Sequence, residues 1–150
     1  MVGYTIESLD TASTGAIITS TARVIYNADA PLDSNTHEAT IDAVAPVTVV
    51  NIGQTGNTYT VDWSATDDTA GSGVKEYTVY VSLNGGPFFV SLTRTTTTSM
   101  VYESRDGLAA TFLVLAQDAA GNVEAAPAGV SVAPVIPSVN LGSLPKAPRT

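Results

Sequence analysis

The sequence predicts an all-β protein whose main part is a sandwich of two antiparallel sheets. Three observations support this prediction. The chain of 150 residues holds 18 Val and 21 Thr, residue types that favour strands over helices. Its central segments alternate apolar and polar side chains with a period of two. Clusters of Gly, Asn, Asp and Ser separate these segments at short intervals, which is typical of seven-stranded sandwiches.

The expected strands of the main part lie between residues 44 and 134. Residues 57–65 are the clearest case, because Tyr59, Val61 and Trp63 alternate with polar side chains. The tripeptide Asn84-Gly85-Gly86 predicts a tight hairpin, since Asn and Gly accept positive φ angles. Pro127 cannot donate to a strand ladder, so the last strand should lie at an edge or break there. The seven expected strands are residues 47–52, 57–65, 74–82, 88–93, 97–103, 110–116 and 123–132.

The two flanking regions differ from this main part. Residues 1–43 hold three strand-like pieces (4–8, 17–26 and 38–41), with a loop expected over 27–35, and these are too few to close a sandwich alone. Residues 135–150 read as an extended, Pro-rich linker or tail. The sequence therefore predicts extra N-terminal strands, one sandwich domain over 44–134, and a C-terminal linker.

Composition excludes several classes of function. The formal net charge is −8 and only six residues are Lys or Arg, so no basic stripe is available for nucleic acid or for an anionic membrane. The chain contains no Cys, which removes disulfides, thiolate catalysis and Cys-based metal sites. No apolar run is long enough to span a bilayer, and no export signal follows Met1. If the parent protein is exported, its signal is expected outside this sequence.

Short motifs run through residues 44–134. They are Ala45-Pro46-Val47, Trp63, Asp67, Gly71-Ser72-Gly73-Val74, Tyr77, Val79-Tyr80-Val81-Ser82, Asn84-Gly85-Gly86-Pro87-Phe88 and residues 116–124. Together they resemble a bacterial fibronectin type III-like, or immunoglobulin-like, β-sandwich. The resemblance implies a module of a large secreted or surface-attached bacterial protein. One position departs from the pattern, because Phe112 stands where such domains usually carry Tyr, so packing alone is expected to hold that corner.

The first 43 residues contain motifs of their own, namely Thr14-Gly15, Ile17-Ile18, residues 22–27, residues 30–33 and Thr40-Ile41-Asp42. Together they resemble the closing strands of another β-sandwich repeat of large bacterial surface proteins. This resemblance implies a piece of a tandem array, in which orphan strands dock on the complete domain or pair with another copy. Neighbouring modules of the same polypeptide are then the expected partners, and an unpaired strand edge would also allow self-association.

Few residues could carry catalysis. His37 is the single histidine, so a serine nucleophile would have only this base, and its polar surroundings predict a solvated loop residue. We therefore expect no enzymatic activity. A small hydrolase remains an alternative, which would need His37 in a pocket beside a serine and a carboxylate.

Acidic residues in two loops suggest a calcium site. In a seven-stranded sandwich the loop after the second strand and the loop after the sixth lie at the same end. This would bring Asp67 and Asp68 near Asp118, Asn122 and Glu124, whose oxygens suit Ca²⁺. The competing interpretation is that these residues shape their own turns, because Asp and Asn commonly accept backbone hydrogen bonds there.

Aromatic residues raise the question of carbohydrate binding. Trp63 alternates with Val61 and Ala65 on the apolar face of its strand, so we expect it in the core. Tyr80 and Tyr102 are expected to be more exposed. The predicted function is a non-catalytic spacer and adhesion module, secreted or at the cell surface, that could bind calcium and a protein or carbohydrate ligand. The alternative is an accessory carbohydrate-binding module of a secreted polysaccharide-degrading enzyme.

Overall fold

The fold was obtained as a computed structural model, which describes residues 11–27 and 29–132. These residues form ten strands and a short 3₁₀ helix, η1 (Arg105–Gly107), with no α-helix among them. The predicted all-β class is therefore confirmed. The expected strand 4–8 and the expected linker 135–150 lie outside the described residues. No helix in the described part of the chain is long and apolar enough to cross a membrane.

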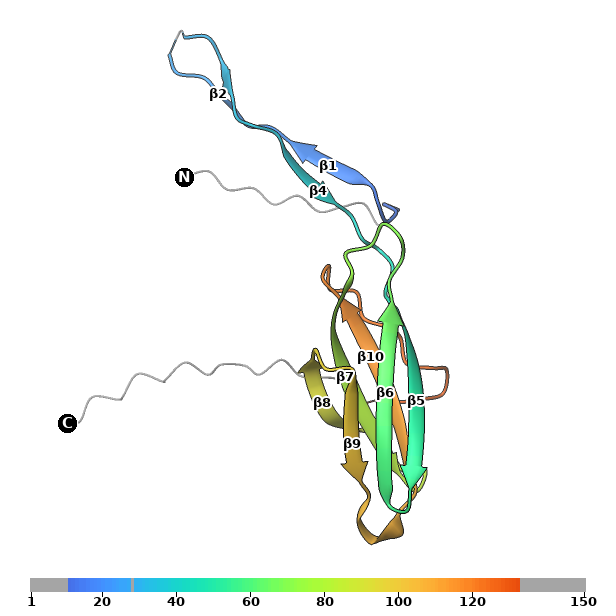
Figure 1. Ribbon diagram of the computed structural model, residues 1–150. Helices are drawn as coiled ribbons and strands as arrows, with labels where there is room; N and C mark the ends of the chain where they lie inside the picture. Colours follow the sequence, from blue (N-terminus) through green and yellow to red (C-terminus); the bar gives the residue numbers. More distant parts are fainter. Residues whose placement is uncertain (1–10, 28, 133–150) are drawn as a thin grey trace, which may run out of the picture.

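The main part of the molecule contains two three-stranded antiparallel sheets (Figure 1). In the first sheet, β6 (Thr58–Thr66) lies between β5 (Val47–Thr55) and β9 (Ser99–Glu103). In the second, β7 (Val74–Leu83) lies between β10 (Ala110–Asp118) and β8 (Phe89–Thr95). The expected hairpin between β7 and β8 is present, with Asn84 at φ 50° and Gly85 at φ 71°.

Side chains from both sheets form one core. The period-two pattern of β6 buries Tyr59, Val61 and Trp63, which are at most 5 % exposed. Alternate residues of β7 and β10 in the other sheet join the same cluster. Full burial of a side chain the size of Val contributes roughly 1.5–3 kcal/mol, so this shared layer is what holds the two sheets together. Its members are Tyr59, Val61, Trp63, Tyr77, Val79, Val81, Phe112, Val114 and Ala116.

Phe112 lies at one end of this core, between two tyrosine rings. Its ring centroid is 5.5 Å from that of Tyr59 and 5.4 Å from that of Tyr102. The Tyr59 hydroxyl also accepts a hydrogen bond of 3.2 Å from the backbone N–H of Ala110, at the start of β10. The expectation that packing alone holds this corner was therefore wrong, because a tyrosine from another strand supplies a hydrogen bond.

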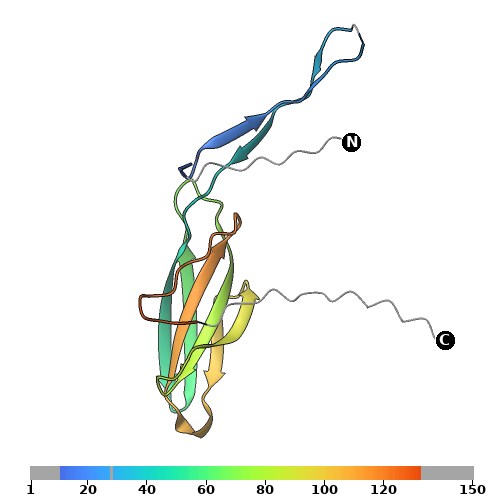
Figure 2. The same cartoon turned by 180° about the vertical axis from the view of Figure 1, so that it is seen from behind.

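The prediction of a seventh strand over residues 123–132 was also wrong. The segment makes only isolated bridges, from Val123 to Gln117 and from Val132 to Phe88. Pro127 lacks the N–H that a continuous ladder requires. The segment instead leaves the end of β10 and crosses the outer face of the β10-β7-β8 sheet, as seen from behind in Figure 2.

The side chain of Glu124 holds this segment to both sheets. The Glu124 backbone N–H donates to the carbonyl of Ala116 at 2.9 Å. Its carboxylate accepts hydrogen bonds from the N–H of Ala116 on β10 (3.2 Å) and from the N–H of Thr48 on β5 (2.9 Å), as well as from the Thr48 hydroxyl. Because β5 and β10 belong to different sheets, one carboxylate joins the two sheet edges.

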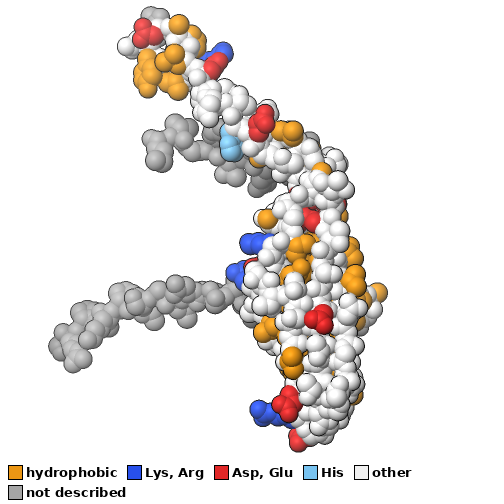
Figure 3. All heavy atoms as spheres, viewed as in Figure 1, with side chains coloured by type: hydrophobic (Ala, Val, Ile, Leu, Met, Phe, Trp, Pro, Cys, Tyr) orange, Lys and Arg blue, Asp and Glu red, His pale blue; other side chains and the backbone are white. Residues whose placement is uncertain are grey.

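Residues before β5 form a narrow antiparallel ribbon that extends beyond the main domain (Figure 1). The strands β1 (Ile17–Ser20) and β4 (His37–Thr40) pair at its base, and β2 (Arg23–Val24) and β3 (Leu32–Asp33) pair towards its tip. A loop was expected over residues 27–35, but the short strand β3 lies within this range. Arg23 donates to both carboxylate oxygens of Asp33, which fastens the tip of the ribbon. Figure 3 shows exposed apolar side chains gathered there, namely Val24, Ile25, Tyr26 and Leu32.

The substitution Glu124→Ala tests the link between the sheet edges. It leaves the N–H groups of Thr48 and Ala116 without their acceptor, so the free energy of unfolding should fall by about 2–4 kcal/mol. Glu103→Ala, which removes an exposed carboxylate at the end of β9, is the matched control and should change it by less than about 0.5 kcal/mol. Urea unfolding measures both. Equal stability of the two variants would contradict this role for Glu124.

Candidate metal centre

Three carboxylates meet where the ribbon joins the main domain. Asp42, Asp67 and Asp118 each offer one oxygen, and these oxygens all lie within 4.8 Å of one another. The ion pairs in the described ranges are Arg23–Asp33 and Arg94–Glu76, so no Lys or Arg there neutralises the cluster. Like charges this close repel, which favours the uptake of a cation.

Strand register explains why these residues meet. Val47 at the start of β5 pairs with Thr66 at the end of β6, so the linker before β5 lies beside the loop after β6. Asp118, at the end of β10, pairs with Val74 at the start of β7 across a register shift. The backbone N–H of Ala119 then donates to the carbonyl of Gly73 at 3.0 Å. The predicted meeting of the two acidic loops at one end of the domain is confirmed.

Asp118 is fully buried and shapes its own loop. One carboxylate oxygen accepts the backbone N–H groups of Gly121 (2.6 Å) and Asn122 (2.8 Å). The other accepts the side-chain amide of Asn122 at 2.7 Å. Gly121 has φ 106°, a conformation open to glycine, so it lets the chain turn tightly around the carboxylate. The structural role that the sequence suggested for Asp118 is thus present, beside its place in the cluster.

Asp67 and Asp68 carry carboxylate oxygens that lack hydrogen-bond partners. One oxygen of Asp67 accepts the N–H of Gly73 at 2.6 Å. The other oxygen of Asp67 and one oxygen of Asp68 are buried with no partner among the described residues. A buried, unpaired carboxylate oxygen is costly unless a proton or a cation satisfies it. Both carboxylates lie against Gly71, where a Cβ would collide with them, so this position has no room for a side chain.

Asp42 connects the ribbon to the main domain. Its carboxylate accepts the N–H of Ser72 at 2.6 Å and that of Val44 at 3.2 Å, and its carbonyl accepts the Asn122 side chain at 3.1 Å. Hydrogen bonding from Ser72, above all from its backbone N–H, holds the pKa of Asp42 below its ordinary value. A cavity of about 220 Å³ opens beside it, lined by Thr40, Ile41, Asp42, Ala70, Gly71 and Ser72.

The structure brings together only some of the predicted calcium ligands. Asp67 and Asp118 lie in the cluster, and Asp68 contacts the same glycine as Asp67. Asn122 points its amide nitrogen at Asp118, while Glu124 is engaged with Thr48 and Ala116 and lies outside the three-residue cluster. Asp42 was not among the candidate ligands predicted from the sequence. The strand pattern could have indicated it, because in an antiparallel hairpin the residues before the first strand lie beside the loop that follows the second strand.

Other candidate residues lie apart from this cluster. His37 is exposed on β4, opposite Ser20 of the ribbon, and lines neither of the described cavities. It is therefore a strand residue, not the loop residue expected. Trp63 is buried as predicted, at 3 % exposure. Tyr80, expected to be exposed, is only 4 % exposed because residues 123–132 cross its face of the sheet, and Tyr102 is half-buried against Phe112.

The arrangement can bind a hard divalent cation. Three carboxylates supply charge, and the unpaired oxygens of Asp67 and Asp68 supply further acceptors within the same loop. Oxygen ligands of this kind suit Ca²⁺, which takes six to eight of them, with water completing the shell.

Comparison with known proteins gives one informative match. The chain is 34 % identical over 139 residues to Chitinase A1 of Niallia circulans, an alignment that covers 90 % of this chain and 17 % of that protein. The chain is therefore a distant homologue of a small part of that enzyme. No domain family matches the sequence. No solved structure matches it either.

Asp118→Ala tests the structural role of the buried carboxylate. The substitution leaves the two N–H groups of Gly121 and Asn122 unpaired, and it should lower the free energy of unfolding by about 2–4 kcal/mol. Asp62→Ala, on the exposed face of β6, is the control and should cost less than about 0.5 kcal/mol. Thermal or urea unfolding in the presence of chelator separates this effect from loss of metal. A cost for Asp118→Ala as small as that of the control would contradict the role.

Proposed function

We propose that the chain is a non-catalytic accessory module of an extracellular bacterial enzyme that degrades a polysaccharide, and that chitin is the polysaccharide. The observation that carries this proposal is the similarity to Chitinase A1 over 90 % of the chain. Because the chain spans only 17 % of that protein, the similarity supports a place within such an enzyme. Chitin is an insoluble polymer that does not enter cells, so an enzyme acting on it is expected to work outside them.

Strand order supports a fibronectin type III-like or immunoglobulin-like sandwich as the architecture of the module. The sheets β5-β6-β9 and β10-β7-β8 have the antiparallel order expected when hairpins and crossovers alternate between two layers. Buried residues on β6 face buried residues on β7 and β10 in one core. In this proposal residues 123–132 stand in place of the last strand.

We propose a mechanical role for the module, as a spacer that fixes the separation and orientation of its neighbours. Flat polysaccharide surfaces are commonly bound by rows of exposed aromatic rings. In the described part of the chain only Tyr26, on the ribbon, and Phe89, on β8, are exposed aromatics, and they lie on separate elements. The remaining described rings are buried or half-buried, which favours a spacer over an aromatic platform.

We further propose that Ca²⁺ binds Asp42, Asp67 and Asp118 and stiffens the junction between the ribbon and the main domain. Asp42 belongs to the linker, whereas Asp67 lies in the loop after β6 and Asp118 at the end of β10 in the main domain. A cation shared between them would oppose motion of one part against the other. The buried, unpaired oxygens of Asp67 and Asp68 support a cation over a purely structural turn.

Calcium should stabilise the folded chain. At a Ca²⁺ concentration about a hundredfold above Kd, binding to the native state should raise the Tm by about 5–10 °C, and chelator should reverse the rise. Asp42→Asn keeps one of the two acceptor oxygens, which can still accept from Ser72, but it removes the charge, so it should abolish most of the shift. Asp62→Asn is the matched control and should leave it intact. A Tm that does not respond to Ca²⁺ would remove the metal from the account.

The spacer role is tested in the parent polypeptide by replacing residues 44–132 with a flexible Gly/Ser linker of equal length. Hydrolysis of insoluble chitin should fall severalfold, while hydrolysis of soluble chitin oligosaccharides should stay unchanged. His37→Ala is the control for catalysis and should affect neither substrate. Unchanged hydrolysis of both substrates, or an equal loss on both, would contradict the proposal.

A further inference from the structure

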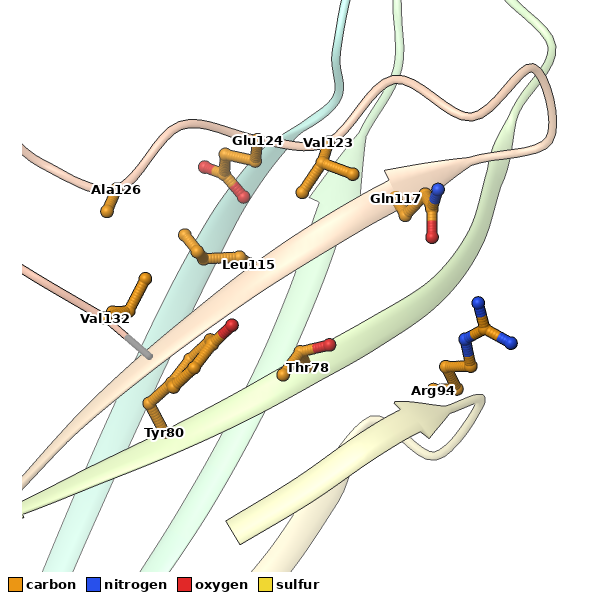
Figure 4. A pocket seen from close by; sticks show the side chains of 9 residues that line it. All are labelled: Thr78, Tyr80, Arg94, Leu115, Gln117, Val123, Glu124, Ala126 and Val132. Carbon is orange, nitrogen blue, oxygen red and sulfur yellow. The ribbon is translucent and has the colours of Figure 1, made fainter. Parts of the chain in front are cut away.

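A cavity beside β7 and β10 has no part in the spacer role or the metal cluster. It has a volume of about 400 Å³, within the range of small-molecule sites, which is about 300–1,000 Å³. The cavity lies between the outer face of β7 and β10 and the segment 123–132 that crosses that face (Figure 4). Its lining residues are Thr78, Tyr80, Arg94, Leu115, Gln117, Val123, Glu124, Ala126 and Val132.

The side chain of Tyr80 lines this cavity. Tyr80 is 4 % exposed as a residue, but its hydroxyl is not among the buried polar atoms that lack a partner in residues 11–27 and 29–132, so solvent in the cavity reaches it. Figure 4 shows this hydroxyl directed between Leu115 and Thr78. Burial raises the pKa of Tyr80, so the hydroxyl stays protonated and keeps its capacity to donate. The hydroxyl can therefore donate to an acceptor atom of a ligand that enters the cavity in place of water.

Arg94 stands at the rim in an unusual backbone conformation. Its φ is 51°, and it lies where the register between β7 and β8 shifts, so that Thr93 and Arg94 both lie opposite Thr78. A left-handed conformation is rare for a residue such as Arg and often marks a functional position. Within the described residues, its ion pair to Glu76 is loose at 3.5 Å, and Figure 4 shows the guanidinium directed towards Gln117.

The lining combines hydrogen-bonding groups with an apolar wall and little free charge. The Glu124 carboxylate is already engaged with Thr48 and Ala116, and Arg94 has Glu76. An uncharged ligand with its own donors, acceptors and an apolar group fits this chemistry better than an ion. An acetamido group has a carbonyl to accept from Arg94, an N–H to donate to Gln117 or Thr78, and a methyl group to lie against Leu115 and Val123.

We infer that this cavity binds an N-acetylated amino-sugar unit of a chitin chain. The inference rests on the proposed function, because the choice of polysaccharide comes from the same similarity to a chitinase. It extends that proposal, since the module would contact the substrate as well as set the spacing of its neighbours. Tyr80 and Arg94 are the residues assigned to recognition, through the phenol hydroxyl and the guanidinium.

The test is an NMR titration of the whole chain with N-acetylglucosamine oligomers, with cello-oligosaccharides as the sugar control. Shifts should saturate and should map to Thr78, Gln117 and Val123. Tyr80→Phe removes only the hydroxyl and should weaken binding about 5- to 10-fold. Arg94→Asn should also weaken it, since Asn tolerates the left-handed backbone and the fold is kept. Tyr102→Phe, a half-buried tyrosine outside the cavity, should leave the Kd unchanged.

Each other outcome of this titration overturns the inference. No saturable shift with the N-acetylglucosamine oligomers would remove the site. Shifts that map to Phe89 or to the ribbon would place binding elsewhere. Equal binding of cello-oligosaccharides would remove the acetamido recognition. None of these outcomes touches the spacer role, because replacing the module in the parent polypeptide tests that role on separate observables.

Discussion

Two carboxylates that bond to backbone N–H groups determine the course of the chain after β10. Asp118 turns the loop by accepting the N–H groups of Gly121 and Asn122, and Glu124 then fastens the chain to Thr48 and Ala116. Side chains thus supply hydrogen bonds that a continuous last strand would otherwise make. The geometry of the acidic cluster and of the large cavity both follow from this segment, since Asp118 belongs to the first and Val123 and Val132 line the second.

In the same region, carboxylates that stabilise the loops through hydrogen bonds also lie close enough together to repel one another. Asp118 is buried, and it lies with Asp67 and Asp42 without a cationic partner among the described residues. Hydrogen bonds compensate Asp118 and Asp42, but one oxygen of Asp67 and one of Asp68 remain unpaired. A role of these residues in shaping their turns is therefore compatible with a role in binding a cation. The first explains why the loops fold as they do, and the second explains why their charges converge.

Local patterns were enough to predict most of the fold. Alternation in residues 57–65 identified β6 and its buried Tyr59, Val61 and Trp63, and Asn84-Gly85 identified the hairpin to β8. Long-range contacts were not predictable in this way. The alternation after Gly121 did not reveal that Glu124 would reach β5, and Tyr80 became buried because of a segment about forty residues away in sequence. Asp42 joined the site through strand register, which a motif search does not examine.

Amide hydrogen exchange tests most directly whether side chains hold the edges of the two sheets. In β5, Thr48 and Ile52 point their N–H groups to the same side, away from β6, because the direction alternates along an antiparallel strand. The account predicts slow exchange at Thr48, Ala116, Gly121 and Asn122, and fast exchange at Ile52. Exchange at Thr48 as fast as at Ile52 would contradict it, because Glu124 would then not hold the edge of β5 in solution.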